Sequence, residues 1–349
     1  MEVKETLAAI LTETGKPLVL DFIKLPDQLE SGQVLVEIIT SGVCGAQLNE
    51  IDAVKGPDKF LPHLLGHEGF AKVVEVGPDV SRLSVGDKVI LHWRPSEGIE
   101  SNTPKYKLRN QTINAGWVTT FNHHAVVSQN RMTKVESEQD KFFMPLLGCA
   151  LTTALGVLRN EAKVSTADSL MIMGLGGVGN AVLQFARYFK LNNITIVDKD
   201  ARKELLARQY GATHFVEFTN KIDTLQALEV LFGELGRPTI AIETSGDVRG
   251  IELCYETSSA NARVILVGVP KIGEKASIYT LPLHFEKSIK GSKGGAASPD
   301  KDIPFILNLV ENNFISRQAF PTESYNFSDI NLALSKLREG VKGRIVLEF

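Results

Sequence analysis

The sequence predicts an α/β protein in which a β-rich segment is followed by a doubly wound parallel sheet with helices on both faces. Short strand patterns crowd the first 150 residues, and strands alternate with helices from about residue 150 to residue 290. A glycine-rich turn joins the first strand and helix of that alternation. We therefore expect two domains, residues 1–150 completed by residues 291–349, and residues 151–290. The 349 residues, 43% of them hydrophobic, can supply a core for each domain.

The strand patterns of the first domain are separated by turn sequences such as Ser31-Gly32 and Gly77-Pro78. They cover residues 18–20, 33–39, 70–76 and 87–91. The second domain has apolar strand patterns at 169–173, 193–197, 214–216, 239–242, 263–267 and 288–290, a spacing typical of a parallel sheet. Two helices, 303–312 and 329–339, and a last strand, 343–347, should follow, and we expect that strand to return to the first domain.

The turn after strand 169–173 carries the pattern G-x-G-x-x-G and opens an amphipathic stretch at 181–190. Gly174 would permit the tight turn, Gly176 the approach of a pyrophosphate, and Gly179 the close packing of the helix. The phosphates of a dinucleotide would then lie at the positive end of that helix. This combination predicts a Rossmann domain.

An acidic residue, Asp198, ends the next strand, about twenty residues after the last glycine. Such a side chain accepts hydrogen bonds from the ribose hydroxyls of adenosine and repels a 2′-phosphate. The position of Asp198 therefore favours NAD over NADP, although the nearby Lys199 and Arg202 weaken this preference.

Composition excludes several classes of function. The formal net charge of -3 provides no broad attraction for nucleic acid or for an anionic membrane. No apolar run approaches the length of a membrane span, and the first residues lack the features of a signal peptide. Three cysteines do not make a disulfide framework, so we expect a soluble protein of the reducing cytoplasm.

Three residues lie in local patterns that suit a metal ligand, namely Cys44, His67 and Cys149. Two thiolates and an imidazole satisfy the preference of zinc and leave its fourth position open for water or substrate. An alcohol bound there loses its proton more readily, and its hydride can then pass to a nicotinamide. The alternative is that the cysteines are buried apolar thiols and the histidine is a core residue. We interpret Cys254, in a predicted helix, as a core residue.

These motifs together resemble the zinc-containing medium-chain dehydrogenases typified by alcohol dehydrogenases, and the resemblance covers nearly the whole chain. It implies a GroES-like catalytic domain beside the Rossmann domain, and one catalytic Zn²⁺ ion held by Cys44, His67 and Cys149 with Glu68 as a neighbouring or exchangeable ligand. It rests on the segments Gly42-Val-Cys-Gly45, Pro62-His-Leu-Leu-Gly-His-Glu-Gly69, Val85-Gly-Asp-Lys-Val89, Leu147-Gly-Cys149, the fingerprint glycines and Val267-Gly-Val-Pro270.

The resemblance also implies contacts with the cofactor. Thr153 would approach the nicotinamide, and the backbone at Val267 and Val269 would hold its carboxamide. Gly45 stands where many relatives have a basic residue that faces the pyrophosphate. Binding of the pyrophosphate would therefore depend more on Gly177, Val178 and Arg344.

Two departures from the family pattern affect the chemistry. Many relatives carry four cysteines for a structural zinc in the region that corresponds to residues 92–116, which here contains none, so we expect no second zinc. Ala46 replaces the serine or threonine that usually relays the substrate proton, and Asn49 replaces a histidine that is often present. The proton would then pass through water, through Glu68, His63 or Glu50, or through a hydroxyl of the substrate.

The sequence offers two hints about the substrate. Trp93, which by resemblance faces the substrate, could stack on a sugar or cyclic alcohol, and Arg94 could pair with a phosphate or carboxylate. We expect an alcohol or carbonyl substrate, with a polyol or sugar derivative as the hypothesis, and a homo-oligomer, dimer or tetramer. The alternatives are a zinc-independent NADPH reductase of activated double bonds and a nucleotide-binding protein that has lost catalysis.

Overall fold

The computed structural model describes residues 2–136, 140–341 and 343–349. It divides into two compact units. The first consists of Met1–Cys149, Ser298–Asn308 and Pro321–Phe349, and the second of Ala150–Ala297 and Leu309–Phe320. The expected domain boundary differs from this division, because residues 291–297 and Leu309–Phe320 group with the second unit.

The first unit is built on two sheets, as the β-rich pattern predicts. The smaller sheet has five strands in the order β4, β1, β2, β7, β8. These strands are β4 (His63–Leu64), β1 (Glu5–Leu11), β2 (Val19–Lys24), β7 (Tyr106–Leu108) and β8 (Gln111–Ile113). Alternate side chains of β1, with those of β7 and β8, fill a buried core beneath it.

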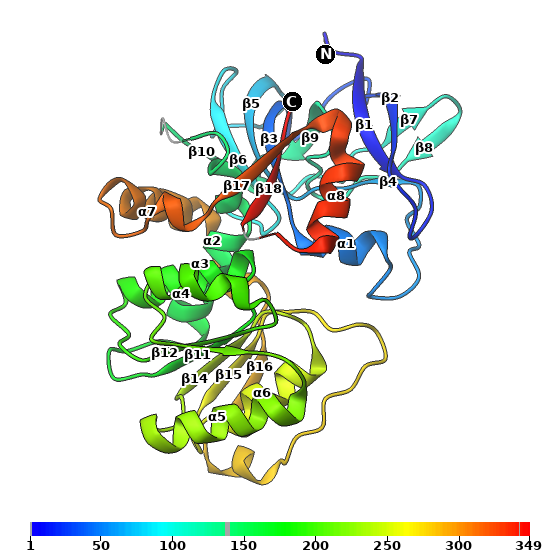
Figure 1. Ribbon diagram of the computed structural model, residues 1–349. Helices are drawn as coiled ribbons and strands as arrows, with labels where there is room; N and C mark the ends of the chain where they lie inside the picture. Colours follow the sequence, from blue (N-terminus) through cyan, green and yellow to red (C-terminus); the bar gives the residue numbers. More distant parts are fainter. Residues whose placement is uncertain (1, 137–139, 342) are drawn as a thin grey trace. The chain divides into compact units, whose positions relative to one another are not determined.

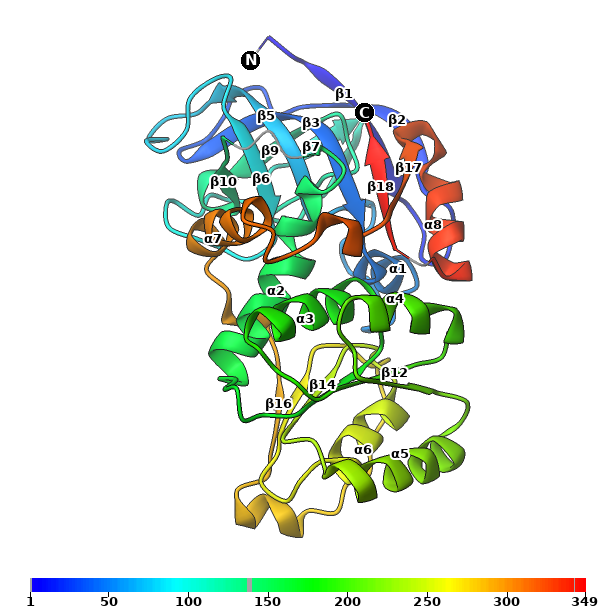
Figure 2. The ribbon, with the colours of Figure 1, turned by 60° about the vertical axis from the view of Figure 1, so that its left-hand side comes forward.

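The larger sheet of this unit has seven strands, of which six follow the order β10, β6, β5, β3, β18, β17, while β9 pairs with β3. In both ribbon views the C-terminal strand β18 lies beside β3 (Figures 1 and 2), and the two pair antiparallel, as expected for the last strand. The strands are β10 (Met132–Lys134), β6 (Lys88–His92), β5 (Glu68–Val76), β3 (Gln33–Val43), β18 (Arg344–Glu348), β17 (Thr322–Asn326) and β9 (His124–Ser128). The helices α1 (Gly45–Ile51), α7 (Pro299–Glu311) and α8 (Ile330–Glu339) accompany them.

The second unit is a doubly wound α/β fold, which confirms the predicted Rossmann class. Its six parallel strands follow the order β13, β12, β11, β14, β15, β16, so the winding direction reverses between β11 and β14. Helices α3 and α4 cover one face of the sheet and α5 and α6 the other (Figures 1 and 2). The strands are β13 (His214–Glu217), β12 (Ile194–Asp198), β11 (Leu170–Met173), β14 (Ile240–Glu243), β15 (Arg263–Leu266) and β16 (Ser288–Gly291). The helices are α2 (Ala150–Gly156), α3 (Gly177–Tyr188), α4 (Glu204–Gln209), α5 (Lys221–Leu235) and α6 (Val248–Thr257).

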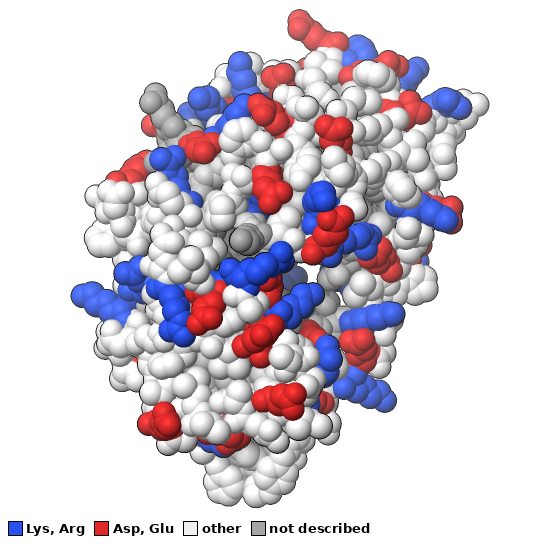
Figure 3. All heavy atoms as spheres, in the orientation of Figure 1, with Lys and Arg blue, Asp and Glu red and all other residues white. Residues whose placement is uncertain are grey.

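Burial explains why these strands form. Every residue of β11 is buried, as a strand covered on both faces requires, and Cys254 of α6 is fully buried in the same core, as predicted. Among the described residues, no helix is long and apolar enough to cross a membrane. On the face shown in Figure 3, acidic and basic side chains are interspersed, in keeping with the small net charge.

Candidate metal centre and cofactor site

The three predicted ligands converge within the first unit. Cys44 stands at the junction of β3 and α1, His67 directly precedes β5, and Cys149 ends the first segment of the unit. Their ligand atoms, two sulfurs and one ring nitrogen, all lie within 4.8 Å of one another. The pairing of β3 with β5 explains why Cys44 and His67 are close. The two strands are antiparallel and hydrogen-bonded to each other, so the end of β3, before Cys44, lies beside the start of β5, after His67.

The electrostatics of the cluster favour a cation. A hydrogen bond from Cys149 holds the pKa of the Cys44 thiol well below its usual range, whereas the same bond and burial raise the pKa of Cys149. Burial lowers the pKa of His67, but the hydrogen bond and the charge of Cys44 outweigh burial and raise it. Because a metal ion binds cysteine as the thiolate, its binding to this pair would release thiol protons.

Glu68, the first residue of β5, completes the surroundings of the cluster. Its side chain is fully buried, and its Oε1 forms an ion pair with Arg344. Its other oxygen, Oε2, has no hydrogen-bond partner among the described residues, and burial raises the pKa of the carboxyl group. Glu68 is not one of the three residues whose donor atoms converge, but its charge acts on Cys149 and His67. The two sulfurs and the ring nitrogen by themselves form a donor set that suits zinc.

Arg344 lies beside Glu68. Strand β18 carries it into the first unit, where its guanidinium is buried against Glu68, and the contact with the pyrophosphate that the resemblance implies stays a prediction. The negative charges of Glu68, Cys44 and Cys149 outweigh burial and raise its pKa. The guanidinium of Arg344 therefore offsets negative charge of the Glu68 carboxylate and of the two cysteines.

Close packing around Glu68 leads to a first prediction. A Cβ added at Gly42 would lie 2.7 Å from Cδ of Glu68, closer than side chains approach, whereas a Cβ at Gly45 would meet nothing within 4 Å. Gly42→Ala should displace the Glu68 carboxylate and destabilise the first unit by ~1–3 kcal/mol, as overpacking does. Gly45→Ala is the matched control and should be neutral in urea denaturation. Equal stability of both variants would contradict the close approach.

Sequence reasoning missed Gln47, a buried residue in the first turn of α1. Its Nε2 lies 2.7 Å from Nδ1 of His67, and its Oε1 accepts a hydrogen bond from the backbone N–H of Gly66 at 2.5 Å. Its Nε2 also donates to Glu50 at 3.1 Å. The available signal was its position three residues after a predicted ligand, but no helix was predicted there.

The hydrogen bonds of His63, Glu50 and Glu68 distinguish the three side chains that were expected as possible proton relays. Both ring nitrogens of His63 are engaged, Nε2 with Asp58 at 2.7 Å and Nδ1 with the carbonyl of Leu64 at 2.9 Å. Glu50 Oε2 accepts a hydrogen bond from Nε2 of Gln47, the same amide nitrogen that lies against His67. Ala46 offers no polar group. Glu68 Oε2 is the candidate whose oxygen lacks a partner among the described residues.

Trp93 and Arg94, the candidate substrate residues, follow β6 directly. The Arg94 guanidinium lies 5.7 Å from the centre of the Trp93 ring, and the Trp93 carbonyl accepts a hydrogen bond from the buried Arg131. His92 holds the start of this turn, because its Nδ1 lies 2.7 Å from the Arg94 carbonyl and its Nε2 lies 3.0 Å from the Thr133 hydroxyl. The backbone of the turn is therefore fixed at both residues.

His92 leads to a second prediction, on pH. Burial lowers the pKa of its ring from 6.5 to about 4, so the unfolded chain takes up a proton in that range that the folded chain does not. The contribution of neutral His92 to stability is complete above pH 6.5 and is lost as pH falls to about 4, a change of ~3 kcal/mol. His92→Asn, which keeps a donor for the Arg94 carbonyl, should flatten this part of the curve of unfolding free energy against pH. If the wild-type protein and His92→Asn showed the same dependence of unfolding free energy on pH, the prediction for His92 would be wrong.

In the second unit, the glycine-rich turn is tied to the acidic residue. The N–H of Leu175 donates to Oδ2 of Asp198 at 2.5 Å, and the Lys203 ammonium lies 3.1 Å from the same carboxylate. Arg202, which the sequence placed near Asp198, pairs instead with Asp200 at 2.7 Å. The fingerprint residues Gly174, Gly176, Gly177, Val178 and Gly179 run from the end of β11 into α3.

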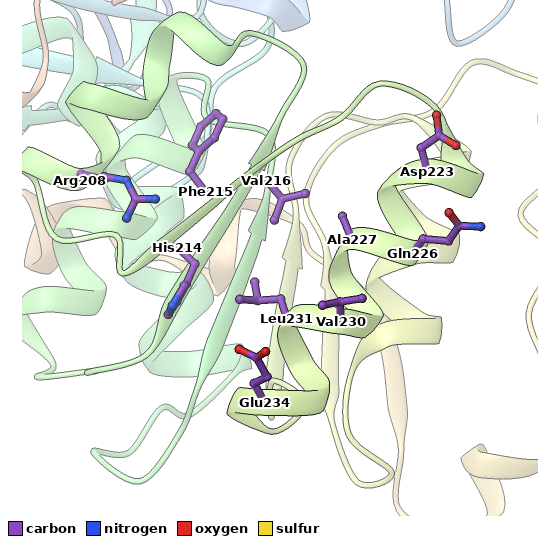
Figure 4. Close-up of a pocket in the computed structure, with 10 residues that line it drawn as sticks. All are labelled: Arg208, His214, Phe215, Val216, Asp223, Gln226, Ala227, Val230, Leu231 and Glu234. Carbon is purple, nitrogen blue, oxygen red and sulfur yellow. The ribbon is translucent and has the colours of Figure 1, made fainter.

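The other predicted cofactor contacts fall at distinct places in the same unit. Thr153 is buried in α2. The N–H of Val267 is already bonded to the carbonyl of Glu243 at 2.7 Å, so only its carbonyl is available to a ligand. Val269 is 48% exposed. A separate hollow of about 590 Å³ between β13 and α5 (Figure 4) contains none of the predicted site residues.

Comparison with known proteins agrees with the fold and with the candidate metal centre. Residues 30–137 match the alcohol dehydrogenase GroES-like domain, and residues 177–312 match the zinc-binding dehydrogenase family. The chain is 28% identical to an S-(hydroxymethyl)glutathione dehydrogenase from Synechocystis sp., over 98% of this chain and 99% of the relative.

Solved structures are similar over almost the full length. Benzyl alcohol dehydrogenase from Acinetobacter calcoaceticus has a TM-score of 0.87 at 25% identity, with 99% of this chain and 100% of the other covered. An alcohol dehydrogenase zinc-binding domain protein from Burkholderia ambifaria has a TM-score of 0.89 at 23% identity, with 99% of each chain covered, and shows the fold alone.

Proposed function

Because the chain belongs to the zinc-containing medium-chain dehydrogenase/reductase family of alcohol dehydrogenase-like oxidoreductases, we propose that it interconverts a polar, polyhydroxylated alcohol and its carbonyl compound, with NAD as the hydride carrier. The observation that carries the proposal is the convergence of the donor atoms of Cys44, His67 and Cys149, which all lie within 4.8 Å of one another.

Each residue of the centre has a distinct task. Cys44, His67 and Cys149 would hold the ion and leave one position open. A zinc ion held by these residues would supply a Lewis acid for the oxygen of the substrate. The Glu68 carboxylate and the Arg344 guanidinium would keep the centre close to electrical balance, and Glu68 is the group best placed to take a proton from that side.

The choice of NAD rests on Asp198. Its carboxylate accepts from the N–H of Leu175 and is paired with Lys203, which holds it at the glycine-rich turn. In this position it would accept hydrogen bonds from the ribose hydroxyls and repel a 2′-phosphate. Lys203 offsets part of that repulsion, so we expect a preference for NAD and not an absolute requirement.

The proposed substrate class rests on two features, the lack of a proton-relaying hydroxyl at Ala46 and the presence of Trp93 and Arg94. Ala46 cannot relay a proton, so a neighbouring hydroxyl on the substrate would supply part of the path. Arg94 adds a positive charge beside the aromatic ring of Trp93, a combination that suits a sugar or polyol carrying an anionic group. The relatives named for benzyl alcohol and for S-(hydroxymethyl)glutathione define the competing substrate classes.

The test combines metal analysis with a substrate panel. Purified protein should contain one zinc ion per chain, and two would contradict the expected absence of a structural site. Polyols and phosphorylated sugars should give higher kcat/KM than benzyl alcohol, S-(hydroxymethyl)glutathione or short alkanols, with NAD better than NADP. A preference for plain alkanols would reject the substrate class, and protein that holds zinc but transfers no hydride to any carrier would reject the function.

Two expectations from the sequence, the oligomeric state and the location, stay predictions. A homo-oligomer, dimer or tetramer, can be tested by sedimentation. The cytoplasmic location follows from the small number of cysteines and can be tested by fractionation. The convergent donors argue against the zinc-independent NADPH reductase. The non-catalytic alternative is tested by whether the zinc-loaded protein transfers hydride.

A further inference from the structure

The turn that follows β6 begins beside the metal centre. The antiparallel ladder between β5 and β6 ends at the pair Glu68 and His92. Opposite residues of such a ladder have their Cα atoms about 4.5–5.5 Å apart, so the turn starts, at Trp93, one residue beyond the partner of Glu68. A Cβ would not fit at Gly148, because the carbonyl of Leu91 stands against it. The end of β6 therefore packs against the start of β5 and against the segment that precedes the second cysteine.

Arg131 reaches this turn from the other neighbour of β6. It directly precedes β10, which is hydrogen-bonded to β6. Its guanidinium donates a hydrogen bond to the carbonyl of Trp93 and forms an ion pair with Glu100. The same guanidinium lies 4.8 Å from the centre of the Trp117 ring. Because the planar fork of an arginine can hold two acceptors at once, this side chain links the start of the turn to the loop at residue 100.

Stability alone gives a poor reason for burying this side chain. The side chain of Arg131 is 4% exposed, whereas that of Glu100 is 41% exposed. Its Nε has no hydrogen-bond partner among the described residues. A buried charge with one unsatisfied donor and a partly exposed partner gains little over an apolar side chain of similar volume. What an apolar side chain could not reproduce is the hydrogen bond to the Trp93 carbonyl.

We infer that Arg131 is a positioning residue, which fixes the Trp93 carbonyl and so presents the Trp93 ring and the Arg94 guanidinium to a substrate at the metal centre. The inference rests on the proposed function, because it takes Trp93 and Arg94 as the pair that recognises a polyhydroxylated substrate with an anionic group. His92 holds the carbonyl of Arg94 independently. Loss of Arg131 would therefore leave the turn anchored at its second residue and released at its first.

Tryptophan fluorescence tests the position of the turn. Trp93 and Trp117 are the two tryptophans of the chain, so Trp117→Phe leaves Trp93 as the only one and keeps an aromatic ring beside Arg131. In this background, Arg131→Met should shift the emission of Trp93 to the red and raise its quenching by acrylamide. Arg82→Met is the matched control, because Arg82 donates to the carbonyl of Glu97 in the same loop at 2.5 Å. Its Trp93 emission should equal that of the parent.

Steady-state kinetics test the effect on the substrate, with sorbitol 6-phosphate and benzyl alcohol as probes. In zinc-loaded Arg131→Met, KM for sorbitol 6-phosphate should rise about 10-fold with little change in kcat, as expected when one positioned contact is lost from ground state and transition state alike. The KM for benzyl alcohol, which has no anionic group, should change much less. Arg131→Lys keeps the charge without the fork and should fall between wild type and Arg131→Met. A purely structural role would instead lower the apparent kcat for both substrates through loss of folded enzyme.

Unchanged Trp93 emission and quenching in folded Arg131→Met would overturn the inference, as would an equal rise of KM for both substrates. If Arg131→Met does not fold, Arg131→Lys takes its place, and values equal to those of wild type in both experiments would overturn the inference in the same way.

These measurements separate the two proposals. Zinc-loaded wild-type protein that oxidises neither probe with NAD would count against the proposed function, while the emission of Trp93, which requires neither zinc nor substrate, would still show whether Arg131 holds the turn. Turnover of sorbitol 6-phosphate with the same KM in wild type and Arg131→Met would defeat the role of Arg131 alone.

Discussion

Replacing Cys149 with serine is expected to abolish zinc retention and to slow hydride transfer by roughly a thousandfold or more. A serine hydroxyl does not ionise near neutral pH and is a poor zinc ligand, so two of three donors remain. The substitution also removes the thiol that bonds to Cys44 and holds the pKa of that thiol low. Zinc content by elemental analysis and kcat/KM with the best substrate are the two measurements.

The chain contains its own control for this experiment. Cys254 is also buried but lies in α6 of the second unit and outside the Cys44, His67 and Cys149 group, and burial raises its pKa well above the ordinary value. Cys254→Ala should lose some stability and keep both zinc and turnover. Normal turnover in Cys149→Ser would show that the cysteine and histidine cluster is not the catalytic centre, whatever metal the protein contains.

Arg344→Met is expected to lower the free energy of unfolding by ~3–5 kcal/mol, because it leaves the carboxylate of Glu68 buried without its partner. Glu68 is fully buried and Arg344 is 8% exposed, so solvent does little to screen the pair. Methionine fills much of the volume of arginine, which limits the contribution of a cavity. Urea denaturation of metal-free protein is the measurement, since bound zinc would add its own stabilisation.

Two further measurements on Arg344→Met identify the cause of the expected loss of stability, namely its dependence on pH and its response to a second substitution at Glu68. Burial already raises the pKa of Glu68, and removing Arg344 should raise it further. The folded variant then binds a proton more tightly than the unfolded chain, so its stability should improve as pH falls toward the ordinary glutamate value of 4.5. Adding Glu68→Gln to Arg344→Met should recover part of the loss at neutral pH. A loss that neither low pH nor Glu68→Gln relieves would exclude the unpaired charge as its cause.

The features that could be predicted from the sequence are those that a short segment determines by itself. The strand 169–173, the glycine turn and Asp198 lie within thirty residues, and burial of both faces of β11 leaves a continuous apolar run. The three ligands were identifiable because each lies in a distinctive glycine-containing motif. Their convergence then follows from the pairing of β3 with β5.

The missed features depend on contacts between distant segments or on weak local patterns. Arg344 and Glu68 are 276 residues apart, and only the pairing of β18 with β3 reveals that they meet. The short strands β7, β8 and β10 have three residues each, too few for an alternating pattern to stand out. Lys203 was overlooked because the turn that follows β12 brings it to Asp198 in place of the nearer Lys199 and Arg202.

The pairing of β18 with β3 also has a consequence for biosynthesis. Glu68 emerges from the ribosome long before Arg344, and the whole of residues 150–297 is translated between them. A nascent chain can therefore form the nucleotide-binding sheet while the first unit still lacks a strand and carries an uncompensated carboxylate. Completion of the metal centre then has to wait for the synthesis of β18, and until that point chaperones would meet this half of the protein in its unfinished form.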